Sequence, residues 1–416
     1  APDKQIYHCF GCGKGGGVIN FIMEIENLSY PDAVRFLARR ANLEVPEDRD
    51  YDGSRGRRSR MLELNRDAAR FFYDNLSKPE GRAAVEYINR RGITAGMVKR
   101  FGLGAAPDGW NHLTDAMTKK GYTPYELVDA GLAKKNKTGG IYDAFRNRLM
   151  FPVIDIRGSV IGFSGRILGD GEPKYLNSPD TLVFSKSRNL FALNLAKRTK
   201  QGMLLLVEGN IDVVSLHQAG FDCAVASLGT SLTPEQARLM ARYTENVVIC
   251  YDADAAGVKA AGRAIGILES TGISVKVLHV TGAKDPDEFI QKNGADAFRV
   301  LIQQSETSID YQILTIRSKY NLEVDEQRVA FLKEATQMLS RLSNAVEREV
   351  YGGRVAAMAG VTPEAVASEV ARAFKRRIAQ EKKKRERDET RPALTAQPRE
   401  RSIRYEDVYS AAAEEG

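Results

Sequence analysis

The sequence predicts an α/β protein whose centre is a parallel β-sheet with helices on both faces. Two observations predict it. Short apolar runs of strand length recur between residues 203 and 280, and each gap between them carries a helical pattern. Strands that alternate with helices in this way pair in parallel, and the helices cover the sheet. The apolar runs are 203–207, 222–226, 247–250 and 275–280, and the helical patterns are 211–219, 234–243 and 255–270.

The segments before and after this sheet have different patterns. A small glycine-rich unit opens the chain, and the charged stretch after it has few apolar residues, which indicates a flexible linker. Helical and then strand patterns follow, typical of an α+β subdomain, whereas the region after the sheet is helical and ends in a charged tail. We therefore expect a small unit at 1–46, a linker at 47–60, an α+β subdomain at 61–200, the sheet domain at 201–294, a helical subdomain at 295–380 and a tail at 381–416.

The composition excludes several classes of protein. The chain has 416 residues, of which 43% are hydrophobic and 28% charged, so it is neither disordered throughout nor too short for a large core. No apolar run is long enough to cross a membrane, and we expect no membrane partner. Four cysteines are too few for a disulfide scaffold and indicate the reducing cytoplasm.

The net charge of +7 is concentrated in two runs. Residues 53–60 carry four arginines and no acid, and residues 375–388 carry eight basic residues against three acidic ones. A run of this kind is usually a solvated face, but it also suits contact with a nucleic-acid backbone. Composition leaves both interpretations open.

Acidic residues follow three of the four predicted strands. Glu208 comes directly after the first run, Asp252 and Asp254 after the third, and Asp285 and Asp287 a short loop after the fourth. The carboxyl ends of parallel strands meet at one edge of a sheet, where ligands bind. Carboxylates gathered there would repel one another unless they held a hard cation such as Mg²⁺ or Mn²⁺. The alternative is that each acid caps the helix that follows it.

The order of these acids resembles a known domain. E-G-x-x-D at 208–212, D-x-D at 252–254 and D-P-D at 285–287 resemble the Toprim domain of bacterial primases, topoisomerases and some nucleases, over about residues 202–290. The resemblance implies metal-assisted phosphoryl transfer. It implies Glu208, Asp252 and Asp254 as magnesium ligands, and Asp212, Asp285 and Asp287 as further catalytic ligands or orienting groups.

The opening unit contains half of a zinc site. Cys9 and Cys12 have the C-x-x-C spacing of a zinc knuckle, but no second pair of ligands lies nearby. Residues 7–13 and 17–21 resemble the zinc-binding domain of bacterial replicative primases, in which another Cys and His precede this point. We therefore expect a chain truncated at its N-terminus, whose intact parent binds Zn²⁺. A redox C-x-x-C is the alternative interpretation.

The segment before the predicted sheet is basic and aromatic. Lys and Arg alternate with Tyr, Asn and Phe over residues 165–179 and 184–191, which suits phosphate contact and stacking on single-stranded bases, although a plain basic loop has the same composition. Together with residues 87–92, Trp110 and residues 146–152, the order resembles the core of bacterial primases. That resemblance implies a nucleic-acid or nucleotide groove lined by Arg91, Arg146, Arg166, Lys174, Asn177 and Lys186, with Arg148 as a neighbour.

The combined resemblance, over about residues 1–380, implies a DNA-directed RNA polymerase of the primase family. Its partners would be single-stranded DNA template, RNA primer and NTPs, together with the replicative helicase, contacted through a C-terminal domain expected beyond residue 416. The core would be monomeric and work at the replication fork in the nucleoid. Two alternatives stay open: another Toprim enzyme, either a nuclease or a topoisomerase, and a non-catalytic module that binds nucleic acid or a helicase.

Overall fold

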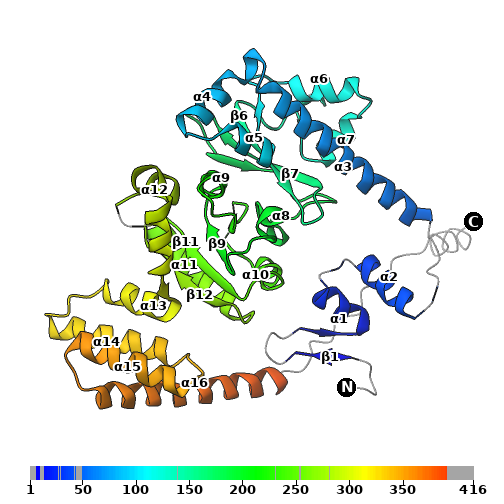
Figure 1. The fold of residues 1–416 in the computed structure, drawn as a ribbon. Coiled ribbons are helices and arrows are strands. Elements are labelled where there is room, and N and C mark those ends of the chain that lie inside the picture. The colour runs from blue at the N-terminus through cyan, green and yellow to red at the C-terminus, as the bar shows by residue number, and fades with distance from the viewer. Residues whose placement is uncertain are drawn as a thin grey trace, which may run out of the picture. The chain divides into compact units, whose positions relative to one another are not determined.

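A computed structural model describes residues 6–9, 14–26, 28, 30–41, 43, 49–137, 139–229, 231–252, 254–280 and 282–390 (Figure 1). The chain forms two compact units, one of residues 1–201 and 207–239, the other of residues 202–206 and 240–416. Each unit is described by itself.

The first unit opens with a β-hairpin and two helices. Strands β1 (Tyr7–His8) and β2 (Gly15–Gly16) pair antiparallel, and the amphipathic helices α1 (Val18–Ile25) and α2 (Tyr30–Arg40) follow. The hairpin brings the amide of Cys9 to the carbonyl of Lys14 at 2.7 Å. Gly15 and Gly16 therefore form the second strand of a small β-ribbon.

The main body of the first unit is an antiparallel sheet covered by helices. The strand order is β3-β6-β7-β8, and every neighbouring pair is antiparallel. The long helix α3 (Arg49–Asn75) packs on β3 and β7, where the buried rings of Phe72 and Phe163 meet edge to face. The other elements are η2 (Pro79–Gly81), α4 (Arg82–Arg90), α5 (Ala95–Phe101), β3 (Gly104–Ala106), α6 (His112–Lys119), α7 (Pro124–Asp129), β4 (Ala133–Lys135), β5 (Ile141–Asp143), β6 (Arg148–Ile154), β7 (Val160–Ile167), β8 (Tyr175–Asn177), η3 (Lys186–Arg188) and α8 (Leu193–Ala196).

The stretch interpreted as a flexible linker, residues 47–60, is helical from Arg49 onward. Arginine is a good helix former, and Arg60 ties this helix to α7 through an ion pair with Glu126 at 2.9 Å and a hydrogen bond to the carbonyl of Gly121. Residues 55–59 are exposed, and they belong to the first turns of α3.

The predicted alternation of strands and helices is confirmed in the second sheet, whose strand order is β10-β9-β11-β12-β13. Strands β11 and β12 are parallel, whereas β13 pairs antiparallel with β12 and adds an edge that the sequence did not predict. The elements are β9 (Leu204–Val207), α9 (Asn210–Gln218), β10 (Ala224–Ala226), α10 (Pro234–Ala241), β11 (Asn246–Cys250), α11 (Ala255–Glu269), β12 (Ser274–Val277), α12 (Pro286–Gln303) and β13 (Glu306–Thr307).

The second unit continues as a helical bundle, as predicted. Its helices are α13 (Ser308–Arg317), α14 (Asp325–Leu339), α15 (Ala345–Ala359) and α16 (Pro363–Thr390). They share a core that includes Phe331, Leu339, Val355 and Val366. Helix α16 runs to Thr390, so the first part of the predicted tail is helical, and residues 391–416 lie outside the described part of the chain. No helix within the described residues has the length and apolarity to span a membrane.

A buried histidine in α9 predicts an acid-sensitive fold. His217 is 3% exposed, shares a hydrogen bond of 3.0 Å with the carbonyl of Ala224, and lies edge-on to the ring of Phe101. Burial lowers the pKa of His217 to about 4, whereas the unfolded side chain titrates near pH ~6.5. The unfolded state therefore binds the proton more tightly, and stability falls as the pH drops from about 6.5 to about 4, by about 3 kcal/mol for this group.

Denaturant unfolding at pH 7.0, 6.0 and 5.0 measures this loss. A His217→Gln variant should show a flatter dependence of the free energy of unfolding on pH over this window, because it has no proton to gain. Parallel pH curves for the two proteins would contradict the assignment.

Candidate active site and nucleic-acid interface

Arg166 on β7 lies between two tyrosine rings. Its guanidinium carbon is 4.9 Å from the ring centre of Tyr87 and 5.6 Å from that of Tyr175. Arg91 joins the same cluster, since its Nε donates to the hydroxyl of Tyr87 at 3.1 Å. The Nε–H of Arg166 is buried and donates no hydrogen bond within the described residues. The predicted groove residues Arg91 and Arg166 are thus brought together by tyrosines that hold their side chains in fixed positions.

The tyrosine cluster connects these arginines to the first acidic motif. An added Cβ at Gly209 would lie 2.4 Å from a carboxylate oxygen of Asp212 and 4.0 Å from the hydroxyl of Tyr175. Burial, and next the charge of Asp212, raise the pKa of Tyr175, so this phenol stays protonated at neutral pH. Asp212 is itself buried in the first turn of α9, where the helix dipole favours a negative charge. Glu208, two residues before α9, is exposed.

Asn177 and Lys186 lie in segments that other residues hold in place. The Asn177 amide donates to the carbonyl of Leu228 at 3.2 Å, beside Gly229, whose φ of +70° suits glycine. The fully buried Gln236 of α10 donates to the carbonyls of Lys186 and Asn189, at 2.9 and 2.8 Å. Sequence reasoning missed Gln236, because nothing in its local pattern shows that it spans to η3. Lys174 is exposed.

Arg146 and Arg148 differ in their surroundings. The guanidinium of Arg146 stacks 3.7 Å from the ring centre of Trp110, and the Trp110 side chain is 63% exposed. Arg148 is buried and donates to the carbonyls of Gly165 and Pro173, at 2.9 and 3.0 Å. Arg146 with Trp110 therefore forms an exposed aromatic and cationic surface suited to a nucleobase, whereas Arg148 supports the loop that leads to β8. The resemblance to primases had singled out both Arg146 and Trp110, but nothing in the sequence showed that their side chains stack on each other.

The acids of the second unit follow two parallel strands. Asp252 is half-buried directly after β11. Asp254 caps α11 by accepting from the amide of Gly257 at 2.7 Å, and Asp285 caps α12 by accepting from the amide of Glu288 at 2.8 Å. Asp287 is buried and accepts from the Gln291 amide at 2.9 Å. Capping, the alternative interpretation, is therefore confirmed for Asp254 and Asp285, and each cap uses one carboxylate oxygen.

The parallel register places the ends of β11 and β12 at the same sheet edge, so these four aspartates follow one edge of the second unit. Within the described residues of either unit, no three His, Cys, Asp or Glu side chains are gathered closely enough to hold a metal ion. In the zinc-like unit, Cys9 is exposed at the end of β1, and Cys12 lies outside the described residues.

Four family models match the chain. They are described as the CHC2 zinc finger, over residues 1–52, the N-terminal domain of the DNA primase catalytic core, over residues 71–197, Toprim-like, over residues 205–290, and the DnaB-helicase binding domain of primase, over residues 309–364. The last match corrects one expectation. The model of the helicase-binding domain of primase matches residues inside this chain, in α13 to α15 and the start of α16, whereas that domain was expected beyond residue 416.

Several primases are similar to the chain. The DNA primase of Clostridium acetobutylicum is 43% identical over 370 residues, which make up 88% of this chain and 61% of that protein. The chain thus spans about three fifths of the length of the curated relatives it matches.

Two solved structures are also similar. The zinc-binding and RNA polymerase domains of the Aquifex aeolicus primase are 33% identical, with a TM-score of 0.61 over 88% of this chain and 87% of that one. A DnaG primase catalytic domain bound to single-stranded DNA is 34% identical, with a TM-score of 0.63 over 74% of this chain and 98% of that one. From these matches, the chain belongs to the family of bacterial DnaG-type DNA primases.

Proposed function

We propose that this chain is the RNA-polymerising part of a primase, which makes short RNA primers on single-stranded DNA. The observation that carries the proposal is the cluster in which Tyr87 contacts Arg91 and Arg166, and Tyr175 contacts Arg166. Asp212 lies close enough for its charge to raise the pKa of Tyr175. The cluster joins cationic groups fit for a nucleic-acid backbone to the first of the acidic motifs. A plain binding module has no need of that connection.

We propose Glu208, Asp252 and Asp254 as the ligands of Mg²⁺ or Mn²⁺. The donor set fits, because all three supply hard carboxylate oxygens and the cap at Asp254 uses only one of its two. Glu208 directly follows β9 and Asp252 comes just after β11, and the carboxyl end of a strand is where ligands bind in sheets of this kind. A bound ion would neutralise charge on the phosphate oxygens of the incoming nucleotide. Asp212, Asp285 and Asp287 would orient these groups, and Asp287 is itself held by Gln291.

In the proposed reaction, the chain's own residues position the substrates. Arg91 and Arg166 would bind template or primer phosphates, with Lys174 and Asn177 beside them, and Lys186 would contact the triphosphate. The 3′-hydroxyl of the primer attacks the α-phosphorus of the NTP, a new ester bond forms, the bond to the β-phosphate oxygen breaks, and pyrophosphate leaves. Because the tyrosine rings already hold Arg166, little ordering of that side chain is needed on binding.

We also propose a role for each of the other parts of the chain. Cys9 and Cys12 would supply half of a zinc site, in a unit that covers about residues 1–46. The polymerase core would comprise a subdomain at 61–200, the Toprim domain at 201–294 and the helical part at 295–380, and act as a monomer. The helicase would contact this protein at the replication fork, and residues 309–364 are a candidate surface for that contact.

Extension of a pre-annealed primer tests the proposed function. A short RNA annealed to single-stranded DNA is given to the chain with NTPs and Mg²⁺, which bypasses any initiation step that needs a complete zinc site. Added ribonucleotides are the expected result. Cleavage of the DNA strand instead would favour a nuclease, and DNA binding with neither reaction would favour a binding module.

Replacing Trp110 should weaken binding of single-stranded DNA. A base stacked on an aromatic ring contributes about 1–3 kcal/mol, so Trp110→Ala should raise the Kd for an oligo-dT by about tenfold or more. Fluorescence anisotropy at one fixed salt concentration measures it. The matched control is Tyr125→Ala, which removes an equally exposed ring from α7. Equal affinity of the Trp110 variant and the unchanged chain would show that no base stacks there.

A further inference from the structure

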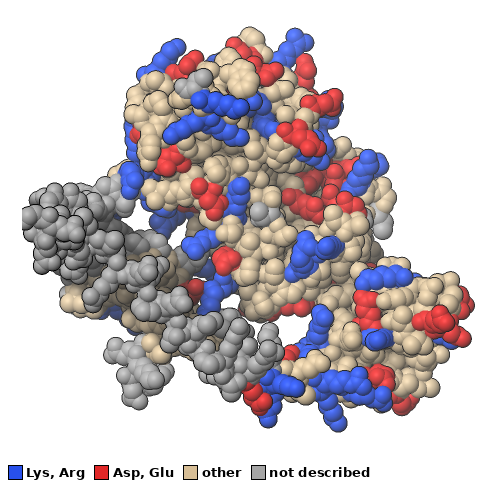
Figure 2. Space-filling model, turned by 180° about the vertical axis from the view of Figure 1, so that it is seen from behind, with Lys and Arg blue, Asp and Glu red and all other residues tan. Residues whose placement is uncertain are grey.

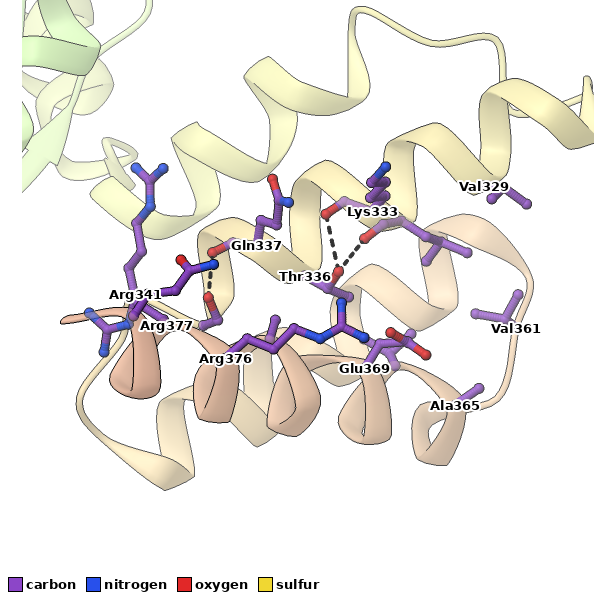
Figure 3. A pocket seen from close by; sticks show the side chains of 15 residues that line it. Val329, Lys333, Thr336, Gln337, Arg341, Val361, Ala365, Glu369, Arg376 and Arg377 are labelled. Atoms are coloured by element: carbon purple, nitrogen blue, oxygen red, sulfur yellow. Dashed lines mark hydrogen bonds between the residues drawn. The ribbon is translucent and has the colours of Figure 1, made fainter. Parts of the chain in front are cut away.

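A groove runs between α14 and α16 on the helical bundle and takes no part in the proposed chemistry. It encloses about 680 Å³ (Figure 3). The apolar part of its lining includes Leu332, Val361 and Val366. The hydroxyls of Thr336 and Ser340 donate to carbonyls of their own helix, at 2.7 Å each, so they add little polarity to the wall. This groove therefore suits a segment with an apolar face.

The rim of the groove is positively charged. Lys333, Arg341, Arg376 and Arg377 line it, against a single acid, Glu369. In Figure 3, Arg341 and Arg377 lie at one end, and the labelled apolar residues Val329, Val361 and Ala365 at the other. Figure 2 shows Lys and Arg side chains along the lower edge of the bundle, where α16 lies. An occupant of this groove should therefore carry negative charge where it meets Arg341 and Arg377, and an apolar face along the groove.

The chain contains a segment with that chemistry, outside the described residues. Residues 405–416 carry four acids and no basic residue, a net charge of −4. Tyr405, Val408, Tyr409 and Ala412 follow the i, i+3, i+4, i+7 spacing of one helical face, and Glu406 and Asp407 fall outside that face. We propose that residues 405–416 dock in the α14–α16 groove of the same chain, antiparallel to α16.

The connection between the two is of suitable length. Helix α16 rises about 1.5 Å per residue, so Thr390 lies about 20 Å beyond Arg377. Fourteen residues, 391 to 404, connect this point to the acidic segment, and a flexible chain of that length has an r.m.s. span of about 20 Å, which matches the return path. A tether that matches the span gives an effective concentration near the millimolar range, so even a weak contact is occupied. In this direction, Glu406 and Asp407 would lie at the end of the groove that Arg341 and Arg377 line. Tyr409 and Ala412 would then lie along the apolar wall.

Photo-crosslinking in the full chain tests the proposal. A benzoylphenylalanine replaces Gln337, an exposed residue of the groove, and a matched control places it at Glu349, an exposed residue of α15 outside the groove. After irradiation, mass spectrometry identifies the peptides joined to each position. We expect the peptide 405–416 of the same chain at position 337, in at least about tenfold higher yield than at position 349.

Variants distinguish specific docking from chance contact. The double variant Val408→Asp, Tyr409→Ser changes the proposed docking segment and not the bundle, and it should lower the crosslink yield about tenfold. The control variant Thr395→Ser, in the connecting stretch, should leave the crosslink yield unchanged. Arg341→Glu with Arg376→Glu should also lower the yield, and adding Glu406→Arg with Asp407→Arg should restore it. Raising NaCl from 0.1 to 1 M should weaken the crosslink, because the Debye length falls from about 10 to about 3 Å.

Three results would overturn the proposal. They are absence of the 405–416 peptide at position 337, crosslinks that join two chains and so identify a second copy as the occupant, and equal yields at positions 337 and 349. Circular dichroism and thermal melting of each variant establish that the bundle is folded.

Discussion

We expect Asp252→Asn to abolish primer extension while the protein still binds DNA. Asparagine keeps the size of the side chain and removes the charge that we propose for metal binding, so the rate should fall on the order of 10³-fold or more. Asp252 does not cap α11, because Asp254 does, and the substitution should leave stability nearly unchanged. Extension of an annealed RNA by the variant and the unchanged chain, at equal enzyme and saturating NTPs, measures the ratio.

Asp296→Asn is the matched control for this experiment. Asp296 lies on α12 in the same unit, its side chain is 96% exposed, and it pairs with Arg299 on its own helix. The same change of charge there should alter extension by less than about twofold. If both variants extend equally well, the acidic edge after β11 is not the catalytic site. If the Asp252 variant also loses DNA binding, the loss of extension reports weakened binding of the template and not the loss of a catalytic group.

Gly104→Ala should have the largest effect on stability. A Cβ at this position on β3 would lie 2.5 Å from the carbonyl carbon of Phe72, 2.6 Å from its Cβ and 2.7 Å from its carbonyl oxygen. Since none of these atoms can turn away, α3 must shift off the sheet. Overpacking of a core costs about 1–3 kcal/mol, and we expect the upper end or more, about 3 kcal/mol. Urea unfolding followed by circular dichroism measures it.

Gly96→Ala makes the same substitution with the opposite expected sign. Gly96 lies in α5, and the atom nearest to an added Cβ is the Thr94 hydroxyl at 3.8 Å, an ordinary contact. Alanine there restricts the unfolded chain and should stabilise the protein by about 0.5–1 kcal/mol. Equal midpoints for the two variants would mean that α3 does not pack on β3 as closely as described.

The pattern of apolar residues was sufficient to predict the buried strands. The apolar runs before Glu208 and Asp252 became β9 and β11, because buried strands need unbroken apolar residues. The same patterns could not predict β13, where Glu306 and Thr307 are polar and pair only because β12 presents an open edge. Residues 49–60 were misinterpreted for a related reason, since the contacts of Arg60 with α7 have no trace in the local sequence.

Within the candidate site, motifs predicted which residues belong to the site. They did not predict the contacts that hold those side chains in place. Arg166 and Asp212 belong to recognisable motifs. The tyrosines that connect them come from α4 and β8, and the stack of Arg146 on Trp110 joins residues far apart in the chain. Gln236, which holds the Lys186 segment, has no motif at all. Such contacts depend on tertiary structure, and a sequence without aligned relatives does not show them.

The two capping aspartates limit which substitutions the site tolerates. At Asp254 and Asp285 a side chain must end a strand loop, start a helix and, in our proposal, carry charge at the reaction centre. Asparagine, serine and threonine satisfy the first two needs about equally well. A stability screen of these positions would therefore score several replacements as harmless, while a screen for primer synthesis would accept only aspartate. At Asp254 and Asp285, the two screens should therefore accept different sets of residues. At an ordinary helix cap such as Thr307, they should accept the same set. That comparison would distinguish a role in folding from a role in the reaction without any ligand bound.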